Sequence, residues 1–287
     1  MIDVVIMAHH ERADARTLAA STAAWLRERG HVAWMMTDDS ATVGLGELAA
    51  DRAPREADLA LCLGGDGTML RAVTLLDGAP VPVLGVNLGR LGYLTEVESD
   101  SLTAALERFE IGAVAGQWHL DERMMLDVVV IAADGTVAGT WRALNEAVVE
   151  KRVSGHTVHL LLRIDGEPFT SYAADGLIVS TPTGSTAYSL SARGPIISPK
   201  HRALLVTPVA PHMLFDRSMV LDPTETAQIE VLGEREAAVA VDGRLVCNLS
   251  EGARVTCSPS TSTANFVRFG NHQYHQVLKA KFGLTDR

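Results

Sequence analysis

The chain has 287 residues, of which 47% are hydrophobic, and a formal net charge of −10 at pH 7. This length leaves room for two domains with a hydrophobic core in each, and the hydrophobic content excludes a largely disordered chain. Because nucleic acids and anionic membranes bind surfaces rich in Lys and Arg, the acidic balance argues against either as the main partner.

The cysteine and histidine content predicts neither a disulfide framework nor a dedicated metal site. Cys62, Cys247 and Cys257 are too few for a disulfide scaffold and lack zinc-ligand spacing. Three pairs of histidines also lack a nearby third ligand, namely His9 with His10, His156 with His159, and His272 with His275. With no signal peptide and no apolar run as long as a membrane span, we expect a cytoplasmic protein.

The first part of the chain alternates between predicted strands and helices. Nearly continuous apolar runs predict strands at 2–7, 32–36, 59–63 and 81–86. Helical periodicity predicts helices at 13–29, from 68 onward, and over a short stretch around 102–109 that Asp100 or Ser101 would cap. A poorly defined helical turn is expected around Leu48. This alternation predicts a parallel sheet covered by helices, typical of a Rossmann-like domain.

The stretch Gly64-Gly65-Asp66-Gly67 follows the buried strand at 59–63 and precedes a helix. Loops of this kind lie beyond the carboxyl ends of parallel strands, where backbone N–H groups and a helix N-terminus can hold phosphate. Asp66 would then be a lone carboxylate in a phosphate-binding turn. The alternative is a tight turn in which Asp66 only caps the next helix.

From Arg123 onward the pattern changes to alternation with hairpin signals. Strands are expected at 125–131, 136–149, 158–164, 168–172, 177–180, 203–207, 228–232, 238–241 and 245–249, with no helix before the C-terminal stretch. We therefore predict an all-β second domain, a sandwich over 120–270, after an α/β domain over 1–119. A helix within 271–287 is expected to pack back on the first domain.

Three polar stretches in the second half are candidates for ligand binding. Asn145-Glu146 interrupts an apolar strand, which fits either a binding pair or an exposed edge position. The hydroxyl-rich loop 180–188 offers hydrogen-bonding groups and one aromatic face to a nucleoside, or is a surface turn. Val241-Asp242-Gly243-Arg244 is most simply a hairpin turn.

Together these motifs resemble the NAD kinase family. The resemblance rests on 64–68, on Asn87-Leu88-Gly89-Arg90-Leu91-Gly92, on Leu144-Asn145-Glu146, on Asp175-Gly176 and on 180–188. It implies a Rossmann-like domain joined to a β-sandwich, and transfer of a phosphoryl group from ATP or polyphosphate to the 2′-hydroxyl of the adenosine ribose of NAD. It also implies Mg²⁺ or another divalent cation and a homodimer or homotetramer.

The same resemblance implies roles for individual residues. Asp66 is the implied general base, and Gly67 shapes the phosphate loop. Asn145 and Glu146 would hold the adenosine end and hydroxyls of NAD, and Asp175 would meet the nicotinamide end from a neighbouring subunit. The adenine loop is implied to consist of Thr186, Ala187, Tyr188, Ser189, Leu190 and Ser191, with looser contacts from Arg71 and His156.

Two other functions remain open at this point. A lipid kinase of the diacylglycerol type shares the Gly-Gly-Asp-Gly turn, but it would need an apolar or basic membrane surface. A catalytically silent NAD-binding regulator would not need Asp66. The sequence departs from the family pattern at Arg193, where glycine is usual, and at Ser218 and Val241.

Overall fold

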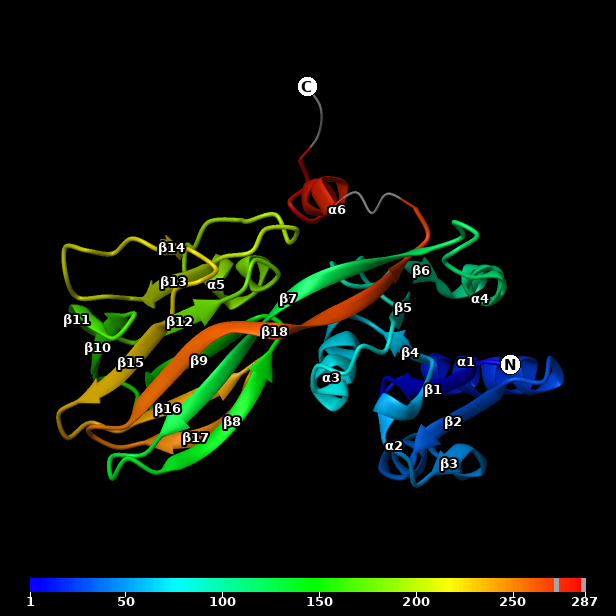
Figure 1. The fold of residues 1–287 in the computed structure, drawn as a ribbon, viewed down its shortest axis with the longest axis horizontal. Coiled ribbons are helices and arrows are strands. Elements are labelled where there is room, and N and C mark those ends of the chain that lie inside the picture. Colours follow the sequence, from blue (N-terminus) through cyan, green and yellow to red (C-terminus); the bar gives the residue numbers. More distant parts are fainter. Residues whose placement is uncertain (271–273, 285–287) are drawn as a thin grey trace. The chain divides into compact units, whose positions relative to one another are not determined.

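The computed structural model describes residues 1–270 and 274–284 (Figure 1). The chain divides into two compact units, which we call unit 1 (Met1–Glu122 with Ala264–Arg287) and unit 2 (Arg123–Thr263). No helix within the described ranges is both long and apolar enough to cross a membrane.

Unit 1 contains a parallel sheet. In spatial order its strands are β5 (Val83–Asn87), β4 (Leu59–Gly64), β1 (Asp3–Ala8), β2 (Val32–Met36) and β3 (Ala49–Ala50). Every residue of β4 is buried, as expected for a parallel strand covered on both faces. Because β1 lies between β4 and β2, the chain leaves β1 toward one edge of the sheet and leaves β4 toward the other edge. The position between β1 and β4 is therefore a topological switch point, and ligands of open α/β sheets bind in the crevice at such a point.

The helices of unit 1 are α1 (Ala13–Glu28), α2 (Thr37–Val43), α3 (Asp66–Leu76), α4 (Leu102–Ile111) and α6 (Tyr274–Lys281). Helix α2 was not predicted, because its sequence has almost no apolar periodicity. The weak turn expected near Leu48 is a short 3₁₀ turn, Gly46–Leu48. The predicted helix at 271–287 includes residues 271–273 and 285–287, among them His272, which lie outside the described residues.

Unit 2 is an antiparallel β-sandwich. One sheet contains, in order, β14 (Met219–Leu221), β13 (Leu204–Val209), β12 (Gly176–Ser180), β9 (Glu146–Lys151), β16 (Ala237–Val241) and β17 (Arg244–Leu249). The other includes β11 (Glu167–Ala174), β10 (Val158–Ile164), β15 (Ala227–Leu232), β7 (His119–Ile131), β8 (Val137–Ala143) and β18 (Arg254–Arg268). Apolar side chains of both sheets, such as Val149, Leu177, Leu160 and Ile229, form one core.

The structure differs from the expectations for this part of the chain in several places, and the short strand β14 was not predicted. The strand predicted at 136–149 is two strands, β8 and β9, which are separated by Leu144 and Asn145. The long strand β18 was not predicted because its middle is rich in Ser and Thr and contains Pro259. A short helix, α5 (Tyr188–Ser191), precedes the C-terminal stretch, although none was expected there. Four residues are too few to produce a helical repeat in the sequence.

The end of β18 belongs to unit 1. Its residue Phe266 pairs with Val83 of β5 in parallel, so the last part of this strand joins the edge of the parallel sheet. In Figure 1 this strand is the long orange ribbon. Residues far apart in the sequence are thereby placed beside β5 and the loop that follows it.

Candidate functional site

The glycine-rich turn joins β4 to α3. Gly65 is the residue that precedes the helix, and Asp66 is its first helical residue, without a side-chain cap. Instead, the Asp66 carboxylate accepts hydrogen bonds from the backbone N–H groups of Tyr93 and Leu94, at 3.0 Å each. The interpretation of Asp66 as a helix cap is therefore wrong. Both carboxylate oxygens are thus held by a second loop, the one that follows β5 and contains Tyr93 and Leu94.

Gly92 makes the close approach of this second loop to Asp66 possible, and Gly64 lets the first turn of α3 pack against the end of β4. A Cβ atom at Gly92 would lie 2.3 Å from Oδ1 of Asp66, and a Cβ atom at Gly64 would lie 2.2 Å from Oγ1 of Thr68. By contrast, a Cβ atom at Gly65 or Gly67 would meet nothing within 4 Å. The turn is therefore packed on the side of Asp66 and open along the backbone of Gly65 and Gly67, where a phosphate could approach.

Arg71 lies one turn further along α3. Its guanidinium donates to Asp39 Oδ1 at 2.5 Å and to the carbonyl of Ala8 at 3.1 Å. The Nε2 atom of His10 lies 3.2 Å from the same Asp39 oxygen. This cluster of side chains gathers around the carboxyl end of β1. The sequence did not single out Asp39, and it drew attention to His10 only as part of a histidine pair without a third ligand. Helix α2, which carries Asp39, was itself not predicted.

In unit 2, Glu146 is the first residue of β9 and is 6% exposed. Strand β9 lies between β12 and β16, so the alternative of an exposed edge position is wrong for Glu146. Burial and, to a smaller extent, the negative charge of Asp242 raise the pKa of Glu146 to about 8, and the backbone N–H of Tyr188 opposes this shift. A carboxyl group with this pKa is mostly protonated at neutral pH and can donate a hydrogen bond.

Asp242 is a further candidate site residue, to which the sequence analysis gave no role beyond a hairpin turn. Val241-Asp242-Gly243-Arg244 does form the hairpin turn between β16 and β17, and Asp242 has a φ of 46° there. Its carboxylate accepts hydrogen bonds from the N–H groups of Leu144, Asn145 and Glu146, at 2.7, 2.8 and 3.1 Å. Burial raises the pKa of Asp242, and these three bonds oppose the shift. Asp242 and its three partners lie almost 100 positions apart in the sequence, so the sequence of the turn does not predict this contact.

The hydroxyl-rich loop packs against Leu144 and Asn145, two of the residues that Asp242 holds. Thr181 donates its N–H to the carbonyl of Asn145 at 2.9 Å and its hydroxyl to the carbonyl of Leu144 at 2.6 Å. A Cβ atom at Gly184 would lie 2.1 Å from the Asn145 carbonyl oxygen. The alternative of a surface turn is wrong, because Ser180, Thr181, Thr183, Ser185 and Ser189 are all buried.

The end of this loop is more open than its beginning. Tyr188 and Ser191 are exposed, while Thr186, Ala187 and Leu190 are half-buried. Burial raises the pKa of Tyr188, and the carboxyl groups of Glu150, Asp175 and Glu146 add to the shift. Arg193 has a φ of 66°, in the left-handed region, which gives a physical reason for the glycine expected there.

Two further candidates lie at different places in unit 2. Asp175, just before β12, forms an ion pair with Lys151 at 2.5 Å and is partly exposed. His156 is exposed in the turn between β9 and β10. Within residues 1–270 and 274–284, no group of three or more His, Cys, Asp or Glu side chains is arranged to hold a metal ion.

A parallel sheet with a glycine-rich turn at its switch point, and a sandwich with a buried polar loop, define a two-domain nucleotide-binding protein. Residues 4–114 match the family described as the ATP-NAD kinase N-terminal domain, and residues 144–269 match the ATP-NAD kinase C-terminal domain. The chain belongs to the NAD kinase family.

Individual relatives and solved structures agree with this assignment. The chain is 36% identical over 277 residues to the NAD kinase of Syntrophotalea carbinolica, covering 96% of this chain and 95% of the relative. It is 41% identical over 246 residues to that of Symbiobacterium thermophilum, covering 85% of each. A crystal structure of yeast NADH kinase complexed with NADH is similar, with a TM-score of 0.88, 25% identity, and coverage of 100% of this chain and 89% of that one.

A second solved structure supports the fold alone. An NAD kinase from Archaeoglobus fulgidus in complex with ATP has a TM-score of 0.71 at 22% identity, and each chain is covered completely. The predicted combination of a Rossmann-like domain with an antiparallel β-sandwich is confirmed.

Proposed function

We propose that this protein transfers the terminal phosphoryl group of ATP, or of polyphosphate, to the 2′-hydroxyl of the adenosine ribose of NAD, giving NADP. The observation that carries the proposal is the Asp66 carboxylate, which two backbone N–H groups hold beside an open glycine turn at a helix N-terminus. Such a turn suits phosphate, and a carboxylate beside it suits removal of a proton from an attacking hydroxyl.

In the proposed reaction, the 2′-oxygen of NAD forms a bond to the terminal phosphorus while the bond from that phosphorus to the bridging oxygen breaks. Asp66 accepts the proton of the hydroxyl group, and ADP leaves when ATP is the donor. A carboxylate has about four lone-pair positions. The bonds from Tyr93 and Leu94 use two of them, so Asp66 keeps the capacity to accept this proton.

We assign NAD binding to residues of unit 2. Asp242 and Thr181 hold the backbone of Asn145 and Glu146 by hydrogen bonds, and we assign the side chains of these two residues to the ribose hydroxyls. Tyr188, exposed at the end of the hydroxyl-rich loop, offers an aromatic face to adenine. Asp175 and His156 are assigned looser contacts with NAD, and Asp175 would act toward the nicotinamide end bound in a neighbouring subunit of a dimer or tetramer.

We propose that the divalent cation, Mg²⁺ or a similar ion, binds together with the phosphates of the nucleotide. Mg²⁺ keeps several waters and is usually bound by phosphates with one or two carboxylates, so one nearby carboxylate such as Asp66 is compatible with it. When bound, it would neutralise charge on the transferred phosphoryl group. We place the reaction in the cytoplasm, where NAD and ATP are available.

The test is direct. Purified protein is incubated with NAD, Mg²⁺ and ATP, and NADP is measured with a dehydrogenase that accepts only NADP. We expect one NADP for each ADP released, and parallel incubations with polyphosphate establish the donor preference. Absence of NADP with every donor would contradict the proposal. Phosphorylation of diacylglycerol vesicles in its place would favour the lipid kinase alternative.

A further inference from the structure

We propose that Arg268 is a positioning residue for Asp66, acting through the backbone of residues 93–96. Arg268 is the last residue of β18 and lies more than 170 positions after this loop. The inference rests on the function proposed above, and it assigns a role to a residue that belongs to no motif of the sequence.

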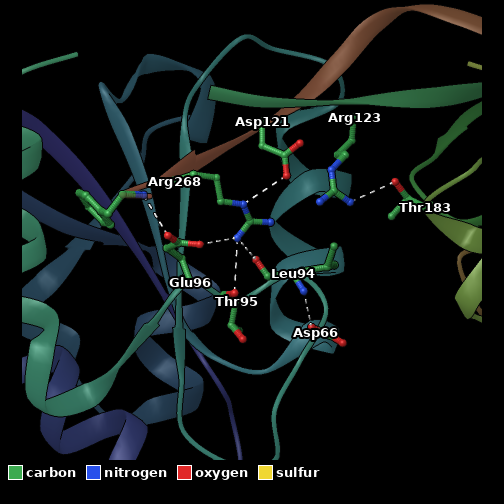
Figure 2. A network of polar contacts seen from close by, with 9 residues as sticks. Asp66, Leu94, Thr95, Glu96, Asp121, Arg123, Thr183 and Arg268 are labelled. Atoms are coloured by element: carbon green, nitrogen blue, oxygen red, sulfur yellow. Dashed lines mark hydrogen bonds and ion pairs between the residues drawn. The ribbon is translucent and has the colours of Figure 1, made fainter. Parts of the chain in front are cut away.

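The segment 93–96 has no regular secondary structure, so its peptide groups need partners from elsewhere. Its N–H groups at Tyr93 and Leu94 donate to Asp66. Its carbonyl groups at Leu94 and Thr95 accept hydrogen bonds from Nη1 of Arg268, at 3.1 and 3.4 Å (Figure 2). Leu94 therefore joins the two side chains directly, since its N–H group holds Asp66 and its carbonyl group is held by Arg268.

Arg268 is itself fixed in place. It is completely buried, and two carboxylates contact its guanidinium: Glu96 Oε2 lies 3.0 Å from Nη1, and Asp121 Oδ2 lies 3.2 Å from Nε (Figure 2). The second oxygen of Glu96 accepts the N–H of Phe269 at 2.9 Å. A buried charge persists only when it is paired and hydrogen-bonded, and the planar guanidinium allows one orientation for such a set of partners.

The position of the Asp66 carboxylate therefore depends on the guanidinium. Lysine at this position would keep the charge but has one nitrogen in place of three, so it cannot bond the loop carbonyls and both carboxylates together. The loop would then relax, and with it the two N–H groups that orient Asp66. A displacement of about 1 Å at a catalytic group costs roughly 100-fold in rate.

The experiment compares Arg268→Lys with Arg108→Lys. Arg108 is a matched control, because its guanidinium also bonds two backbone carbonyls of unit 1, those of Gln117 and Phe269, without contacting residues 93–96. For Arg268→Lys we expect kcat to fall about 10- to 100-fold, with KM for NAD and ATP changed by less than about twofold. For Arg108→Lys we expect kcat within about twofold of the unaltered protein.

Two further measurements separate positioning from general stability. Amide hydrogen exchange at Tyr93 and Leu94 should become faster in Arg268→Lys and not in Arg108→Lys. In an Asp66→Asn background, Arg268→Lys should lower the residual rate by less than about twofold, because residues that act as a unit are not additive. An unchanged kcat, or an equal loss in both backgrounds, would overturn the inference.

A folding defect in Arg268→Lys would not end the test. Asp121→Asn leaves the guanidinium in place and weakens only one of its contacts, so we expect a smaller fall in kcat with the same unchanged KM. An unchanged kcat in that variant would overturn the inference as well. Failure of the unaltered protein to form NADP is a different result, which contradicts the proposed function itself.

Discussion

Glu146 is a carboxyl group in surroundings that favour its neutral form. Burial and the charge of Asp242 raise its pKa to about 8, from an ordinary value of 4.5. Between these two pH values the folded protein binds a proton at Glu146 that the unfolded chain has lost. The free energy of unfolding therefore falls as pH rises through this window, and the whole cost of ionising the buried group is present above it.

We predict that Glu146→Gln removes this pH dependence. The variant should gain stability relative to the unaltered protein as pH rises from about 5 to 8, by up to about 1.4 kcal/mol per pH unit. Urea unfolding of both proteins across this range measures the difference. A difference that stays constant with pH would show that Glu146 ionises normally in the folded protein.

Single residues also show why part of the site escaped prediction. The Gly-Gly-Asp-Gly turn is contiguous and follows an apolar strand, so its position could be inferred from local sequence. Asp242 and Arg268 act through partners about 100 and more than 170 positions away. The residues next to Asp242 predict only a hairpin turn, and those next to Arg268 predict at most the end of a strand. Local sequence patterns therefore do not reveal these contacts.

At the scale of elements, the turn between β16 and β17 fixes the start of β9. We predict that Asp242→Asn destabilises unit 2 by about 1–3 kcal/mol, because an amide has one acceptor oxygen and leaves at least one buried N–H without a partner. NAD affinity should fall together with stability, since Asn145 and Glu146 lose their support. Thermal unfolding and NAD titration measure the two effects.

Asp134→Asn is the matched control for this substitution. Asp134 also lies in a hairpin turn, between β7 and β8, but it is exposed, and among the described residues its side chain bonds Thr136 alone. We expect a change in stability within about 0.5 kcal/mol and no change in NAD affinity. Equal effects of the two variants would contradict the supporting role of Asp242.

Elements with strong local signals were predicted well, and the others were not. The apolar runs of β1, β2, β4 and β10 and the periodicity of α1 are visible in the sequence. Strand β18 pairs with β15 near its start and with β5 near its end, and this pairing overrides the weak strand preference of its Ser- and Thr-rich middle. Helices α2 and α5 are short and lack apolar periodicity in the sequence. Contacts with other elements stabilise them, such as those of Asp39 with Arg71 and of Ser189 with Thr207.

At the scale of the whole molecule, the proposed cation is predicted to act through the nucleotide. Chelation with EDTA should abolish NADP formation and leave the unfolding temperature of the nucleotide-free protein unchanged, because Mg²⁺ is usually held by substrate phosphates and not by an all-protein cage. Differential scanning calorimetry with and without EDTA provides the check. A lower unfolding temperature after chelation would indicate a structural metal site instead.

The most direct test of the central claim is the rate of NADP formation by Asp66→Asn. If Asp66 is the general base, kcat should fall about 100- to 10,000-fold, while the dissociation constant for NAD changes by less than about threefold, because unit 2 supplies the proposed NAD contacts. Thermal unfolding of the variant confirms that it is folded. NADP formation at the rate of the unaltered protein would contradict the account.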